Sequence, residues 1–125
     1  MTNKLTFLLI EDTPMVILEL KVLVEKYAKI FSLITIIGDK KSVNFKDYKY
    51  IDLVLIDVRL TSANSAELCR LIKSEFPNSF IIGMRNQGTY HMRKEMVDNG
   101  ALGFIMKDCN AIEILAEIEK IIVSK

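Results

Sequence analysis

Two kinds of hydrophobic segment alternate along the chain, separated by short polar stretches. Compact apolar runs rich in valine, isoleucine and leucine are typical of strands that are buried on both faces of a sheet. Such runs occupy residues 5–12, 32–38, 51–57, 79–84 and 102–107. Between them, apolar residues recur with the period of an amphipathic helix at 13–30, 65–76, 89–100 and 111–124. Strands that alternate with helices predict a parallel, doubly wound α/β sheet with helices on both faces.

Residues with special backbone properties mark the ends of the predicted helices. Thr13 is placed to cap the first helix, and Pro14 fits its first position, where a missing N–H costs nothing. Pro77 ends the second helix, and Gly100 is the residue type that usually closes a helix in the left-handed conformation. The expected helices are therefore bounded by local signals as well as by their period.

The composition is that of an ordinary globular domain. The chain has 125 residues, enough for one hydrophobic core and too few for two, so we expect a single domain over 1–125. A formal net charge of +1 gives no sign of attraction to nucleic acid or membrane. Cys69 and Cys109 lack metal-ligand spacing and form no disulfide framework, which favours a reducing compartment. The first apolar run is too short to span a membrane, and a soluble cytoplasmic protein is expected.

Charged residues gather at the carboxyl ends of the predicted strands, where parallel α/β sheets bind their ligands. Three of them are acidic, namely Glu11 and Asp12 after the first strand and Asp57 after the third. Two are basic, Arg85 after the fourth strand and Lys107 after the fifth. Clustered carboxylates repel unless a cation neutralises them, and oxygen ligands favour Mg²⁺ or Mn²⁺ over zinc. An aspartate between such a metal and a lysine can attack phosphorus and form an acyl phosphate, so we predict that Asp57 is phosphorylated.

The stretches LLIEDTP, DLVLIDVRL and NGALGFIMKD, in this order, resemble the receiver domain of bacterial two-component response regulators. The resemblance covers essentially the whole chain and implies a five-stranded flavodoxin-like sheet with the strand order 2-1-3-4-5. It implies a function as a phosphoacceptor switch, enzymatic only in its own phosphotransfer and slow autodephosphorylation. It also implies site residues and their roles: Glu11 and Asp12 as Mg²⁺ ligands, Asp57 as phosphoacceptor and metal ligand, Arg59 as a metal ligand through its backbone carbonyl, Lys107 as the phosphoryl contact, and Phe104 as the switching aromatic.

The same resemblance implies partners. A histidine kinase or a phosphotransfer protein would donate the phosphoryl group, and no membrane is involved. The chain is then either a whole protein or the N-terminal part of a longer regulator. The pair Lys107–Asp108 resembles receivers attached to helix-turn-helix DNA-binding domains, so a DNA-binding output domain is one expectation. A homodimer through the last two helices and the last strand is another.

Several positions depart from the receiver pattern. Arg85 stands where a switch Ser or Thr is expected, and Asn86 where a small residue leaves access to the acceptor. The loop after Asp57 has lost its proline and glycines, with Ser65 in place of the last glycine, and the segment 40–50 is short for a helix. An arginine offers five donors and a fixed charge. We hypothesise that Arg85 pairs with Asp57 or with its phosphoryl group.

Two other classes of function compete with the phosphoacceptor. A phosphorylation-independent pseudo-receiver, kept for its protein-binding surface, is favoured by the altered residues and opposed by the retained acids and lysine. An aspartyl phosphatase fits poorly, because Asp57-Val58-Arg59 lacks a second acid as proton donor. On the first helix, Met15, Ile17, Leu18 and Val22 form either an exposed apolar strip or part of the core.

Overall fold

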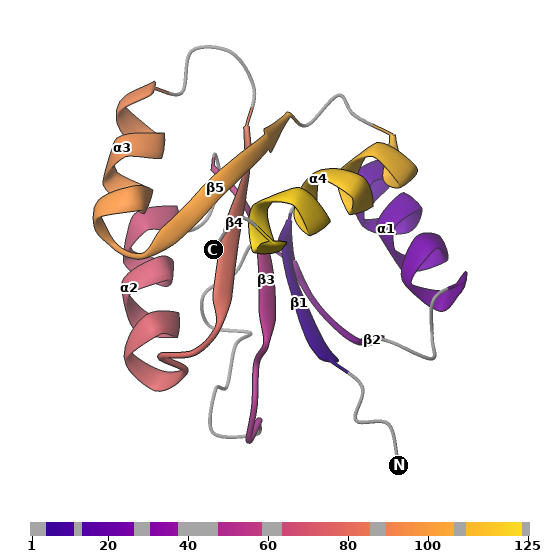
Figure 1. The fold of residues 1–125 in the computed structure, drawn as a ribbon, viewed down its shortest axis with the longest axis horizontal. Helices are drawn as coiled ribbons and strands as arrows, with labels where there is room; N and C mark the ends of the chain where they lie inside the picture. The colour runs from indigo at the N-terminus through magenta and orange to yellow at the C-terminus, as the bar shows by residue number, and fades with distance from the viewer. Residues whose placement is uncertain are drawn as a thin grey trace.

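The computed structural model describes residues 5–11, 14–26, 31–37, 48–58, 64–85, 90–106 and 110–123. Within these residues the chain forms one five-stranded sheet and four helices (Figure 1). The strands are β1 (Leu5–Glu11), β2 (Phe31–Ile37), β3 (Leu53–Asp57), β4 (Phe80–Arg85) and β5 (Ala101–Met106). The helices are α1 (Pro14–Lys26), α2 (Ser65–Glu75), α3 (Tyr90–Asp98) and α4 (Ala111–Val123).

The sheet is parallel throughout, with the order β2-β1-β3-β4-β5. Helices α2 and α3 cover one face, and α1 and α4 cover the other (Figure 1). The chain reverses direction along the sheet between β1 and β3, which lie side by side at its centre. In this architecture ligands bind beyond the carboxyl ends of the strands near that reversal. The predicted doubly wound flavodoxin-like α/β fold is confirmed.

The two faces of the sheet bury separate hydrophobic clusters, because successive side chains of a strand point to opposite sides. On β1, Leu8 and Ile10 pack in the cluster that contains side chains of α2 and α3, and Leu9 packs in the one with α1 and α4. Every residue of β3 is buried. A strand with no solvent face explains why the run 53–57 is apolar at every position until its final aspartate.

Local signals mark several helix ends, among them the start at Pro14 and the close at Gly100 that the sequence predicts. Helix α1 begins at Pro14. The side chain of Asn64 caps α2 by accepting a hydrogen bond from the Glu67 N–H at 3.0 Å. After α3, Gly100 has a φ of +111°, a conformation that residues with a side chain rarely adopt. Thr13 and residues 38–47, which include most of the polar segment 40–50, lie outside the described residues.

The apolar strip considered for the first helix is divided between core and surface. Ile17 is 9% exposed and packs in the cluster with Ile114 and Ile118 of α4. The side chains of Met15, Leu18 and Val22 are 64%, 57% and 59% exposed. The strip therefore consists of these three residues, and Ile17 belongs to the core because α4 covers that side of α1. No helix in the described part of the chain is both long enough and apolar enough to cross a membrane.

Candidate functional site

Two buried carboxylates lie at neighbouring positions on the carboxyl edge of the sheet. Ile10 of β1 is paired with Ile56 of β3, and the next residue on each strand is an acid, Glu11 and Asp57. Paired positions on adjacent strands are about 5 Å apart. Glu11 is fully buried, and Asp57 is only 2% exposed. The sheet register thus places the first predicted ligand beside the predicted phosphoacceptor.

Hydrogen bonds from two other elements hold the main chain of the acceptor. The Ser65 hydroxyl, at the start of α2, donates to the carbonyl oxygen of Asp57 at 2.7 Å in a buried contact. On the other side of the same peptide group, the N–H of Val58 donates to the carbonyl oxygen of Met84 in β4 at 2.9 Å. The backbone at Asp57 is therefore fixed by both a helix and a neighbouring strand.

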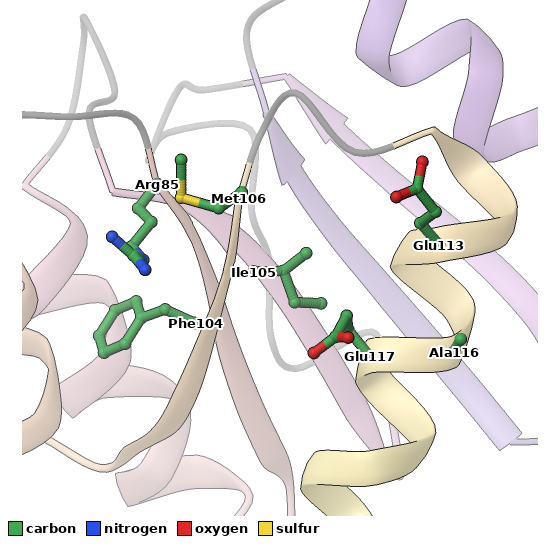
Figure 2. A pocket seen from close by; sticks show the side chains of 7 residues that line it. All are labelled: Arg85, Phe104, Ile105, Met106, Glu113, Ala116 and Glu117. Carbon is green, nitrogen blue, oxygen red and sulfur yellow. The ribbon is translucent and has the colours of Figure 1, made fainter.

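Arg85 and Phe104 lie together at the outer end of the sheet. Arg85 is the last residue of β4 and pairs with Met106, so the strand continues one residue further than the sequence pattern predicts. Phe104 pairs with Gly83, two residues before Arg85, and therefore lies on the same face of the sheet. In Figure 2 the Arg85 guanidinium points toward the Phe104 ring. The sheet register thus brings the predicted switch position and the predicted aromatic together.

The ring of Phe104 occupies space that a side chain at position 83 would need. A Cβ atom built on Gly83 would lie 2.5 Å from Cδ1 and 2.6 Å from Cε1 of that ring, and 3.2 Å from Cε of Met96. On α3, the guanidinium carbon of Arg93 is 6.0 Å from the centre of the Phe104 ring, at the outer limit for a cation–π contact. The aromatic side chain thus packs inward between β4 and α3.

A groove of about 360 Å³ opens beside the end of β5 (Figure 2). Its lining combines Arg85 and Phe104 with residues of β5 and two carboxylates of α4, Glu113 and Glu117. Both carboxylates have partners within α4: Glu113 exchanges hydrogen bonds with Asn110 at the start of the helix, and Glu117 pairs with Lys120 at 3.2 Å. The groove therefore carries no cluster of uncommitted charge.

Three of the predicted site residues, Asp12, Arg59 and Lys107, lie outside the described residues. Among the residues that are described, no group of three His, Cys, Asp or Glu side chains is gathered as a metal site. The proposed roles of Asp12, Arg59 and Lys107 remain predictions. Conversely, the sequence pattern does not reveal the hydrogen bond from Ser65 to the Asp57 carbonyl or the space above Gly83 that the Phe104 ring fills. In the sequence Ser65 stands out only as a replaced glycine, because no periodicity indicates the acceptor of its hydroxyl.

The donors that are present suit a hard divalent cation. Glu11 and Asp57 offer carboxylate oxygens and no nitrogen or sulfur, which matches the preference of Mg²⁺. Two carboxylates buried side by side repel each other, and a cation between them removes that repulsion. The residues at this edge of the sheet therefore fit a magnesium site.

Comparison with known proteins identifies the type of domain. Residues 7–119 match the family described as "Response regulator receiver domain". The "Response regulator ArlR" of Staphylococcus aureus is 34% identical over 73 residues, which cover 58% of this chain and 33% of that protein. Over the aligned segment this chain spans about a third of the length of ArlR.

Solved structures show the same fold. A response regulator from Thermotoga maritima is 25% identical, covers 97% of this chain and 99% of its own, and superposes with a TM-score of 0.78. The chemotaxis response regulator CheY4 of Vibrio cholerae is 13% identical over 95% of this chain and 99% of its own, with a TM-score of 0.81. The receiver domain of the sensor histidine kinase PA1611 from Pseudomonas aeruginosa, 17% identical over 94% and 97% of the two chains with a TM-score of 0.75, was solved with a magnesium ion in its active-site cleft. The carboxylate pair, the parallel sheet and the family match agree, and the chain belongs to the response regulator receiver domains.

Proposed function

We propose that this receiver is a phosphoacceptor switch in a two-component system and that Asp57 is its acceptor. The observation that carries the proposal is the buried Asp57 carboxylate at the end of β3, next to the buried Glu11 of β1. Two buried acids at neighbouring strand ends are the arrangement that a phosphoryl-transfer site with a divalent cation needs, because the cation and the phosphoryl group both bind carboxylate oxygens there. A phosphoryl-transfer site explains why both acids are retained.

The transfer is a displacement at phosphorus. A carboxylate oxygen of Asp57 attacks the phosphorus of a phosphohistidine on a histidine kinase or phosphotransfer protein. The P–N bond breaks with its electron pair going to the ring nitrogen, and the histidine, which already carries a proton on its other ring nitrogen, leaves as neutral imidazole. Mg²⁺, when bound, supplies charge neutralisation for the phosphoryl oxygens. Glu11 and Asp57 would hold the metal with Asp12 and the Arg59 carbonyl, and Lys107 would contact the phosphoryl group. The roles of Asp12, Arg59 and Lys107 are carried over from the family resemblance alone. The domain catalyses only this transfer and the slow hydrolysis of its own acyl phosphate.

Arg85 would act on the product. Arg85 at the end of β4 is one position beyond Met84, the residue that pairs with Asp57, and its guanidinium points toward the Phe104 ring, so contact with the phosphoryl group requires a different side-chain rotamer. A guanidinium there can donate to phosphoryl oxygens and stabilise the acyl phosphate. We expect Arg85→Thr to change the lifetime of the phosphorylated state, measured by the loss of the phosphoryl mass over time. An unchanged lifetime and conformation would exclude this role.

The kinase would dock on α1. Met15, Leu18 and Val22 follow a spacing of three and four residues, so they form one exposed apolar strip along that helix. Helix α1 begins three residues after Glu11, which places the strip next to the acceptor edge. An apolar strip on a helix is the kind of surface that another helix recognises. Leu18→Glu is therefore expected to weaken transfer from the kinase while leaving uptake from a small phosphodonor unchanged.

The test of the function is phosphoryl uptake by the whole chain. The chain is incubated with acetyl phosphate and Mg²⁺, and its intact mass is measured, with Asp57→Ala as the matched control. A gain of one phosphoryl group that the control lacks is the expected result. A chain that gains no mass and does not bind beryllofluoride contradicts the proposal.

That negative outcome would favour the second candidate, a phosphorylation-independent pseudo-receiver that binds its partner unmodified. The observation in its favour is Arg85 at the end of β4, where the receiver pattern has a hydroxyl. In either case the output would be an attached domain or a separate protein. The resemblance at Lys107–Asp108 favours an attached DNA-binding domain. A homodimer is a further expectation. We place the protein in the cytoplasm, in keeping with the free thiol of Cys69.

A further inference from the structure

Ser65 connects the start of α2 to the acceptor residue itself. Its side chain is buried, at 6% exposure, and its hydroxyl donates to the Asp57 carbonyl oxygen at 2.7 Å. The two residues are eight positions apart, so this bond ties the start of α2 to the end of β3. The receiver pattern has a glycine at this position, which has no side-chain donor.

This bond controls the orientation of the peptide group that follows Asp57. With Ser65 donating to its carbonyl and the Val58 N–H donating to Met84, both polar groups of that peptide are held. The backbone torsion on the carboxyl side of the Asp57 Cα is then fixed. Because the carboxylate hangs from the same Cα, the direction in which it can approach a phosphorus atom depends on this peptide.

Loss of the Ser65 bond would leave that peptide held through the Val58 N–H alone, which loosens the torsion. Asp57 is the last residue of β3, and the Ser65 hydroxyl reaches its carbonyl oxygen from outside the sheet. Displacements on the order of 1 Å between reacting atoms reduce the rate of a displacement reaction by up to about 100-fold. A residue that never touches the phosphoryl group can therefore alter the rate of phosphorylation.

We propose that Ser65 is a positioning residue that aligns the Asp57 carboxylate for phosphoryl transfer. The role rests on the proposed function, since it presupposes that Asp57 is the acceptor. The positioning role adds Ser65 to the site. Its hydroxyl acts through the main chain of the acceptor, at a position where the receiver pattern has a glycine and therefore no hydroxyl.

The experiment measures the rate of phosphoryl uptake against the concentration of acetyl phosphate, at saturating Mg²⁺. For Ser65→Ala we expect the maximal rate to fall about tenfold, within the range that misplacement produces, with the half-saturating donor concentration unchanged. Ser65→Thr keeps a hydroxyl and is expected to remain within about twofold of the wild-type rate. Ser65→Val has the shape of threonine without the hydroxyl and should be as slow as the alanine variant.

Asn64→Ala is the matched control for a general weakening of α2. It removes the cap of the same helix, where the Asn64 side chain accepts from Glu67, and leaves the Ser65 hydroxyl in place. The wild-type rate is expected for this variant. A Ser65→Val chain as fast as Ser65→Thr, or an Asn64→Ala chain as slow as Ser65→Ala, overturns the positioning role.

The two failures are distinguishable. If the wild-type chain takes up no phosphoryl group, the proposed function fails and the positioning role falls with it. If the wild-type chain is phosphorylated and all Ser65 variants react at its rate, only the positioning role is wrong. Should Ser65→Ala fail to fold, as judged from its unfolding transition, the comparison of threonine with valine decides the question alone.

Discussion

Replacing Gly83 with alanine places a methyl group where the Phe104 ring now lies. The added carbon would be 2.5 Å and 2.6 Å from two ring atoms, well inside contact distance, and 3.2 Å from Met96. Gly83 itself is buried in β4, so the methyl group cannot turn toward solvent. The ring is only half-buried, and it is the group that must move.

The magnitude follows from two opposing terms. Forcing an extra carbon into a packed site costs about 1–3 kcal/mol. Replacing glycine by alanine where the backbone permits it returns about 0.4–1 kcal/mol through the unfolded chain. The net expectation is a loss of about 1 kcal/mol in the free energy of unfolding. With a urea dependence of about 2 kcal/mol per molar, the unfolding midpoint falls by about half a molar.

Urea unfolding of four chains separates the ring contact from other effects: wild type, Gly83→Ala, Phe104→Ala and the double variant. In the Phe104→Ala background the added methyl group meets no ring, so Gly83→Ala should become neutral or slightly stabilising, giving a coupling energy of about 1 kcal/mol or more. Gly103→Ala is the matched control in β5, because its added carbon meets only the flexible end of Ile121 at 3.2 Å. We expect it to change stability by less than about 0.5 kcal/mol.

The reasoning would be refuted by a Gly83→Ala chain as stable as the wild type. It would also be refuted if the same loss of stability persisted after the ring is removed, because the methyl group would then clash with something other than Phe104. A rise in the stability of Gly103→Ala would not count against it.

Four further predictions concern the described scaffold. Asn64→Ala removes the cap of α2 and should lower the free energy of unfolding by about 1 kcal/mol, whereas Asn64→Ser should lose little; urea midpoints decide this. Burial raises the pKa of the Cys69 thiol from 9.0 to about 12. The unfolded chain therefore releases this proton first, so stability is lost as pH rises from about 9 toward 12, and Cys69→Ala should flatten that part of the pH profile. In a Cys109→Ser chain, Cys69 is the one remaining thiol, and it should resist alkylation at pH 8 until urea unfolds the chain. Rapid labelling of Cys69 without denaturant would contradict its burial. Gly100→Ala should destabilise by about 1 kcal/mol or more, because alanine at a φ of +111° is strained and its Cβ would lie 2.6 Å from Cγ of Lys73; an unchanged thermal midpoint would disprove it.

The order of the elements and the position of the acceptor could be predicted because each depends on neighbours in the sequence. The apolar run that ends in Asp57 identifies a strand with no solvent face, and the structure buries every residue of β3. Pro14 begins α1 and Gly100 closes α3 through their own backbone preferences. Parallel strands then bring their carboxyl ends to one edge, which is why Glu11 and Asp57 could be expected there.

Other features depend on which distant elements face each other. Ile17 is buried only because α4 packs beside α1, and no pattern within α1 specifies how wide a face that neighbour covers. The register of β4 against β5 decides that Phe104 fills the space over Gly83.

Local period and backbone preference suffice to predict the succession of strands and helices, the start of α1 at Pro14, the close of α3 at Gly100 and the acid at the end of β3. Only the tertiary structure decided that the Ser65 hydroxyl reaches the Asp57 carbonyl, that Gly83 makes room for a ring, and that three residues of α1 remain exposed while a fourth is buried. The physical reason is that hydrogen bonds and close packing act over a few ångströms in space. The contacts within that range are chosen by the register of the sheet and by the helices that cover it.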